Sequence, residues 1–250
     1  MPKQWGAVLQ GHEFDLQDWR DMLKPPFDPW VEVHGADTVL RSNSFGDLTS
    51  SNEVRDRAVT HIERLNGAMF VAMQGQPLQF GGVIEFASDG KHSRTLFAEG
   101  FVERARLRMH AVAVVIGPDG VPKPNPPPKE SDVQRWAAIA DTDDLLEDAL
   151  IFFGRASPSD HGSPPTFWFD IYKALECLIE KFGGAHKFCT LNWAPKAQIE
   201  NLKRTADWGR HASRSRRHPP PPNPTTKQEA YELMAKLLRK AFEAGDASRP

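Results

Sequence analysis

Cysteine is scarce in this sequence: Cys177 and Cys189 are the only two in 250 residues. They do not form a CxxC pair, and no cluster of cysteine and histidine has metal-ligand spacing, so neither a disulfide framework nor a zinc site is indicated. Long apolar runs are also missing, because no stretch approaches the 18 or more apolar residues of a membrane span. We therefore expect a protein with no metal, no cofactor and no membrane-spanning segment.

Other sequence signals are absent as well. The first residues, MPKQWGAVLQGHEF, lack the basic-then-apolar layout of a signal peptide, so the expected location is cytoplasmic. There is no GxxxxGK[ST] phosphate loop and no GxSxG nucleophile motif. A formal net charge of -2 argues against indiscriminate coating of nucleic acid, although a local basic patch remains compatible with it.

What is present predicts an α+β fold. Over residues 1–116 most segments have strand character, with apolar alternation and a hairpin turn at Ser88-Asp89-Gly90-Lys91. One helix begins at the capping box Ser50/Glu53 and is expected to end at Asn66-Gly67. The prediction for this part is a mostly antiparallel sheet with one helix packed on it, as a domain of unknown role.

The remainder of the chain differs in composition. Residues 117–130 (GPDGVPKPNPPPKE) are too rich in proline to enter a core and are interpreted as a linker. Residues 131–245 carry apolar stripes with helical spacing, which predict an all-α domain of four or five helices in a bundle. One of these helices is expected to start near Pro195 and to bury Ile199, Leu202 and Ala206.

The most distinctive segment runs from Asn201 to His218. It contains one acid, Asp207, and six cationic residues, which are Lys203, Arg204, Arg210, Arg214, Arg216 and Arg217. On a helix, Arg204 and His211 would lie within about 20° of the same direction. Gly209 could instead end the helix between them. Two interpretations stay open, a site that handles phosphate and a solvated basic segment beside the prolines at 219–222.

The pattern Arg204-x6-His211 resembles the Arg-x(4 to 6)-His motif of HEPN domains, over about residues 131–243. The resemblance implies a compact helical bundle, a homodimer with facing motifs, and the metal-independent ribonuclease activity of bacterial toxin and antiviral defence systems. It makes Arg204 and His211 the catalytic pair, with the arginine stabilising phosphate charge and the histidine transferring protons. The candidate substrate-binding residues are Lys203, Arg210, Arg214, Arg216, Arg217 and Trp208, with RNA or another phosphate-bearing ligand as the partner.

Two other hypotheses stand beside the nuclease. The chain could be a non-catalytic module that binds a protein or ligand and uses the basic segment for docking, or a degenerate family member that binds nucleic acid or a nucleotide without cutting it. Asp170, Lys173 and Glu176 line one outer helix face, where spacing favours surface ion pairs over a role in orienting a histidine.

Overall fold

The computed structural model of the chain describes residues 4–73, 75–87, 92–97, 127–156, 164–210 and 221–246. Contacts between Cα atoms divide the chain into two compact units. The first, here termed the sheet unit, comprises Met1–Arg55 and Leu78–Ser131, and the second, the helical unit, comprises Asp56–Pro77 and Asp132–Pro250. The chain therefore leaves the sheet unit partway along one helix, returns at Leu78 and enters the helical unit again at Asp132.

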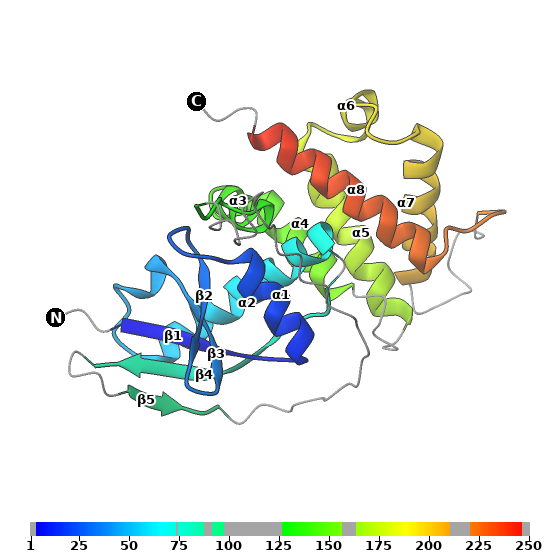
Figure 1. Cartoon of the computed structure of the whole chain (residues 1–250). Helices are drawn as coiled ribbons and strands as arrows, with labels where there is room; N and C mark the ends of the chain where they lie inside the picture. The colour runs from blue at the N-terminus through cyan, green and yellow to red at the C-terminus, as the bar shows by residue number, and fades with distance from the viewer. Residues whose placement is uncertain are drawn as a thin grey trace, which may run out of the picture. The chain divides into compact units, whose positions relative to one another are not determined.

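The sheet unit is built on a five-stranded antiparallel sheet, which confirms the α+β class expected from the sequence (Figure 1). The strand order is β2-β3-β1-β4-β5. Val8, Val39 and Ile84 form a buried cluster on one face of the three central strands, and Phe86 packs against them. The strands are β1 (Gln4–Gln10), β2 (Trp30–His34), β3 (Asp37–Arg41), β4 (Gln79–Phe86) and β5 (His92–Thr95).

The two outermost strands of the sheet, β2 and β5, contact each other through side chains. Nε2 of His34 on β2 lies 3.2 Å from Nδ1 of His92 on β5. Arg94 of β5 also donates hydrogen bonds of 3.0 and 3.1 Å to both carboxylate oxygens of Asp37, at the start of β3. Because β2 and β5 are the outermost strands, the sheet must curve strongly for these side chains to touch.

Helix α2 (Ser51–Met73) begins with the predicted capping box, in which the Ser50 amide donates to Glu53 Oε2 at 3.2 Å and the Glu53 amide to Ser50 Oγ at 3.3 Å. The prediction that Asn66-Gly67 ends this helix is wrong, because the helix continues to Met73. Residues 56–73 also group with the later helices, not with the sheet against which the sequence analysis placed them.

Gly67 lies inside α2 because another helix passes very close to it. A Cβ atom at Gly67 would lie 2.1 Å from the carbonyl oxygen of Leu150 on α4 (Asp144–Arg155). A Cβ atom at Gly154 would in turn lie 2.9 Å from the Gly67 amide nitrogen. The two glycines thus allow the backbones of α2 and α4 to approach more closely than any side chain would permit.

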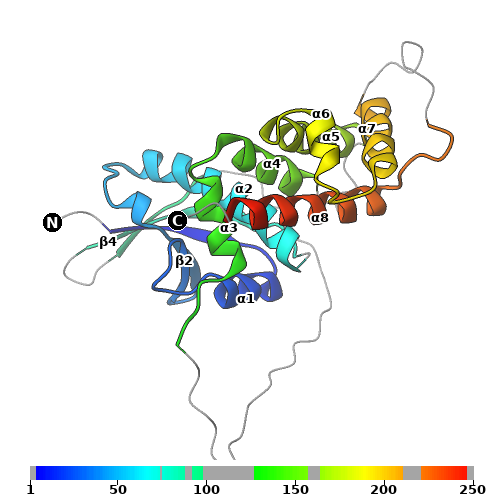
Figure 2. The same cartoon turned by 90° about the horizontal axis from the view of Figure 1, so that it is seen from above.

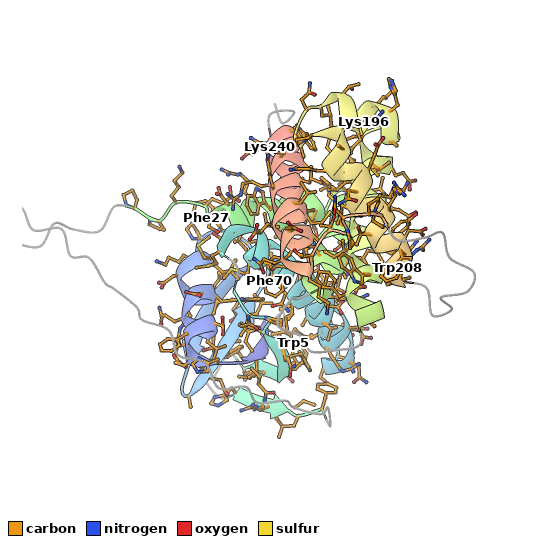
Figure 3. The ribbon with its side chains drawn as sticks, turned by 90° about the vertical axis from the view of Figure 1, so that its right-hand side faces the viewer. Trp5, Phe27, Phe70, Lys196, Trp208 and Lys240 are labelled. Carbon is orange, nitrogen blue, oxygen red and sulfur yellow. The ribbon has the colours of Figure 1, made fainter. Side chains whose placement is uncertain are left out.

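Beside this crossing, aromatic rings from three helices form the core of the helical unit. The Phe153 ring of α4 stacks on Tyr231 of α8 (Lys227–Asp246) with centroids 4.6 Å apart. Phe70 of α2, which is labelled in Figure 3, meets both rings edge-on. All three residues are almost completely buried. Burial of three aromatic side chains contributes several kcal/mol to stability and fixes α2 as part of this unit.

The described residues after 131 form helices joined by turns and irregular segments, and α5 (Pro164–Lys181) is the helix around which others pack. Helices α4, α6, α7 and α8 all contact α5, as the two views of the unit show (Figures 1 and 2). The elements not yet delimited are α1 (Glu13–Met22) and η1 (Asn43–Phe45) in the sheet unit, and α3 (Asp132–Ala140), α5 (Pro164–Lys181), α6 (Ala185–Thr190), α7 (Lys196–Arg210) and α8 (Lys227–Asp246) in the helical unit.

Several expectations fall outside the described residues. These are the hairpin turn at 88–91, the strand pattern that ends at Ile116 and most of the proline-rich linker. Within the described ranges, no helix combines the length and the apolar character needed to cross a membrane.

The close crossing of α2 and α4 predicts the effect of a single methyl group. Gly67→Ala should lower the free energy of unfolding by about 2–3 kcal/mol, because the overlap with the Leu150 carbonyl outweighs the better helix propensity of alanine. Gly245→Ala is the matched control, since its Cβ would meet no atom closer than 3.6 Å. Urea denaturation of both variants measures the difference, and equal stability would contradict the described packing.

Candidate functional site

Helix α7 carries the first part of the predicted basic site. It starts just after Pro195, whose carbonyl oxygen accepts hydrogen bonds from the Gln198 and Ile199 amides, and it buries Ile199, Leu202 and Ala206 as the sequence predicts. It does not stop at Gly209 but continues to Arg210. The helical register that relates Arg204 to the end of the motif is therefore present through Arg210.

Of the two alternatives left open for Gly209, the structure shows that it does not end the helix, and the residue packs against α5. A Cβ atom at this position would lie 2.3 Å from Cδ1 of Trp168 on α5. The missing side chain lets the last turn of α7 rest directly on the indole. This contact fixes where the C-terminal end of α7 lies on α5.

Arg210, one of the candidate substrate-binding residues, is already engaged within the protein. Its Nε and Nη2 atoms donate hydrogen bonds of 3.0 and 2.8 Å to Asp207 Oδ1. Its guanidinium carbon lies 3.9 Å from the ring centroid of Tyr172 on α5, in cation–π geometry. The structure thus places Arg210 as a link between the two helices.

Tyr172 extends this link along α5. Burial, followed by a hydrogen bond to the Glu176 carboxylate, raises the pKa of the Tyr172 hydroxyl, which stays protonated at neutral pH. Glu176 Oε2 also accepts a 3.0 Å hydrogen bond from Lys173 Nζ. The sequence spacing indicated this ion pair between Lys173 and Glu176. Through Tyr172, Glu176 is also connected to Arg210 of α7.

Lys203 and Arg204 differ from Arg210. Among the described residues, neither has a hydrogen-bond or ion-pair partner. Arg204 is exposed and Lys203 is partly exposed. Trp208, which is labelled in Figure 3, is partly exposed and lies one turn beyond Arg204. The other predicted site residues, His211, Arg214, Arg216 and Arg217, lie outside the described residues.

A pocket of about 630 Å³ opens between α5 and α7 beside Lys203. Its lining from α5 follows one helical stripe and continues into the turn that ends the helix. Sequence analysis missed this pocket, because the stripe has the spacing of a solvated helix face. The lining residues are Lys173, Glu176, Cys177, Ile179, Glu180, Gly183, Gly184 and Lys203.

Two titratable groups on α5 have altered acidity. Burial raises the pKa of the Cys177 thiol to about 11, so it is neutral and a poor nucleophile at pH 7. Burial also raises the pKa of the Asp170 carboxyl to about 6, against an opposing effect of Arg155. Asp170 does not line the pocket, whereas Cys177 does.

A second polar cluster lies inside the helical unit. Arg64 of α2 is 3% exposed and donates hydrogen bonds to Asp141 Oδ1 at 2.7 Å and to Glu147 Oε1 at 3.0 Å. Its Nη2 atom lies 2.6 Å from Nδ1 of His61, one turn earlier on the same helix. The cluster joins α2 to the start of α4.

The same cluster predicts a loss of stability in acid. Burial, followed by the charge of Arg64, lowers the pKa of His61 from 6.5 to about 4. Between these values the unfolded chain binds a proton that the folded chain excludes, so stability falls as the pH falls from 6.5 to 4. The expected loss is about 3 kcal/mol.

Urea denaturation at pH 7 and pH 4.5 tests this. His61→Gln should show a clearly smaller pH dependence, because the amide does not titrate and can still accept a hydrogen bond from Arg64. His186→Gln, on the exposed surface of α6, should behave as the unchanged protein. An identical pH slope in His61→Gln would rule out the proposed linkage.

The described part of the site contains cations, carboxylates, an indole and a neutral thiol. Among the described residues, no group of three or more His, Cys, Asp or Glu side chains could hold a metal ion. Comparison of the chain with known proteins finds no matching family model, no matching curated protein and no matching solved structure.

Proposed function

We propose that the helical unit is an HEPN-like domain that binds RNA and cleaves it, with Arg204 and His211 as the catalytic pair. The observation that carries this proposal is the state of Arg204, an exposed arginine without a hydrogen-bond or ion-pair partner among the described residues. An unpaired guanidinium on a helix that is anchored by its neighbours is suited to bind a phosphate. The helix continues through Gly209 to Arg210, which supports the helical spacing of the motif as far as that residue.

The chemistry follows from these two groups. The 2′-hydroxyl oxygen of a ribose attacks the adjacent phosphorus while His211 accepts its proton, so a bond from O2′ to phosphorus forms. Arg204 stabilises the negative charge that develops on the phosphate oxygens. The bond from phosphorus to O5′ then breaks, and the departing oxygen takes a proton from the imidazolium. The products are a 2′,3′-cyclic phosphate and a 5′-hydroxyl.

The remaining predicted residues divide into two groups. Lys203 is available for a second phosphate, and Trp208, one turn from Arg204, can stack on a base. Arg210 acts by holding α7 on α5, since Asp207 and Tyr172 already occupy its guanidinium. Arg214, Arg216 and Arg217 would add to affinity for the backbone of the RNA in a salt-dependent manner.

The wider proposal follows the resemblance to HEPN domains. The helices would form a compact bundle that pairs with a second copy of the chain, so that two Arg/His motifs face each other. The biological setting would be a bacterial toxin or antiviral defence system. Metal-independent cleavage is the part of this proposal that is simplest to test.

Purified protein should cleave RNA in the presence of EDTA. His211→Ala and Arg204→Ala should each reduce the rate by at least 100-fold, because each removes one part of the proton transfer or charge stabilisation. The melting temperature of both variants should remain unchanged. Lys196→Ala is the matched control, since Lys196 starts the same helix and pairs with Glu200 at 3.5 Å.

Three outcomes distinguish the hypotheses. Cleavage that survives in both variants excludes the catalytic pair. RNA binding that weakens with salt, without any cleavage, identifies a binding protein that is not a nuclease. Absence of both cleavage and binding favours a module that recognises another protein or ligand.

A further inference from the structure

The pocket between α5 and α7 contains two charged side chains that no other described residue neutralises. Lys203 and Glu180 both line the pocket, and the side chain of neither has a hydrogen-bond or ion-pair partner among the described residues. Of the other charged lining residues, Lys173 and Glu176 are bonded to each other. The pocket thus offers one available cation and one available carboxylate.

One wall of the pocket is held in place by a chain of contacts across the two helices. Asp207 binds Arg210, the Arg210 guanidinium lies over Tyr172, and Tyr172 hydrogen-bonds to Glu176. Glu176 then binds Lys173, which lines the pocket together with it. Side chains restrained in this way lose little additional freedom when a ligand binds.

The two available groups define the chemistry of a suitable ligand. It should carry an anion for Lys203 and N–H donors for Glu180. A carboxylate accepts most strongly from two parallel N–H groups. Among nucleobases, guanine offers such a pair at N1 and N2, whereas adenine and cytosine place a ring acceptor beside the amino group and uracil flanks its N–H with two carbonyl oxygens.

We propose that this pocket binds guanine nucleotides, with the Glu180 carboxylate accepting from N1–H and N2–H of the base and Lys203 pairing with the phosphate. The proposal builds on the function proposed above, because it gives the RNA site a preference for guanine next to the phosphate bound by Arg204. A volume of about 630 Å³ is within the usual range of about 300–1,000 Å³ for small-ligand sites. Cys177 provides a neutral part of the lining.

Calorimetric titration with guanosine 5′-monophosphate tests the proposal on the full-length protein without any need for cleavage. The nucleotide should bind at least 10-fold more tightly than adenosine 5′-monophosphate. Glu180→Gln should remove this difference, because the amide replaces one acceptor with a donor that faces the base donors. Lys203→Ala should weaken binding of the nucleotide while leaving the preference for guanine over adenine intact.

The control is Glu200→Gln, which removes a carboxylate from α7 outside the pocket lining. It should bind guanosine 5′-monophosphate as tightly as the unchanged protein. Equal affinity for the guanine and adenine nucleotides, or undiminished preference in Glu180→Gln, would overturn the proposal.

The failure of this proposal can be told apart from the failure of the nuclease. Guanine-selective binding without RNA cleavage would retain the pocket and remove the catalytic pair. Cleavage that depends on Arg204 and His211, without any guanine preference in binding, would retain the nuclease and remove the pocket assignment.

Discussion

The contact between Gly209 and Trp168 is the constraint on which the rest of the candidate site depends. It fixes the end of α7 on α5 at a separation that leaves no room for a Cβ atom. From this point the two helices run antiparallel, since Arg210 meets Tyr172 and Lys203 shares a pocket with residues 173–184. The register of α7 thereby determines which cations face α5 and which face solvent.

That register separates the cationic residues of α7 by role. Arg210 is neutralised by Asp207 and stacked on Tyr172, so its charge holds the helices together. Lys203 and Arg204, about two turns before it, have no side-chain hydrogen-bond or ion-pair partner in the described part of the chain. A segment that is uniformly basic in the sequence therefore contains one cation engaged within the protein and two that have no such partner among the described residues. The distinction arises from the carboxylates and rings that surround each group.

The sequence predicted elements better than it predicted how they pack. Apolar spacing identified α7 and its buried stripe, and the Ser50/Glu53 capping box located the start of α2, because both signals are local. Gly67 and Gly209 were read as possible ends of helices, since glycine weakens an isolated helix. In the folded chain Gly67 permits the close approach of Leu150, and Gly209 permits that of Trp168. Each pair is distant in the sequence. No local pattern contains that information.

The same limitation applies to the units and to the pocket. Residues 56–73 belong with helices that follow more than fifty positions later, although they directly follow the first strands of the sheet. Glu180 and Lys203 come from different helices, and only their packing makes them neighbours of one cavity. Residue types alone left two interpretations of the basic segment open, a phosphate site and a solvated segment, and they gave no sign that Glu180 and Lys203 line one pocket.

The central claim is that the face formed by α5 and α7 binds a nucleotide through Lys203, Arg204 and Glu180. Amide chemical-shift mapping with a guanine-containing RNA dinucleotide in EDTA tests it most directly. The account predicts that the largest shift changes fall within residues 173–184 and 199–210. Changes confined to the sheet unit, or the absence of changes at saturating dinucleotide, would contradict it.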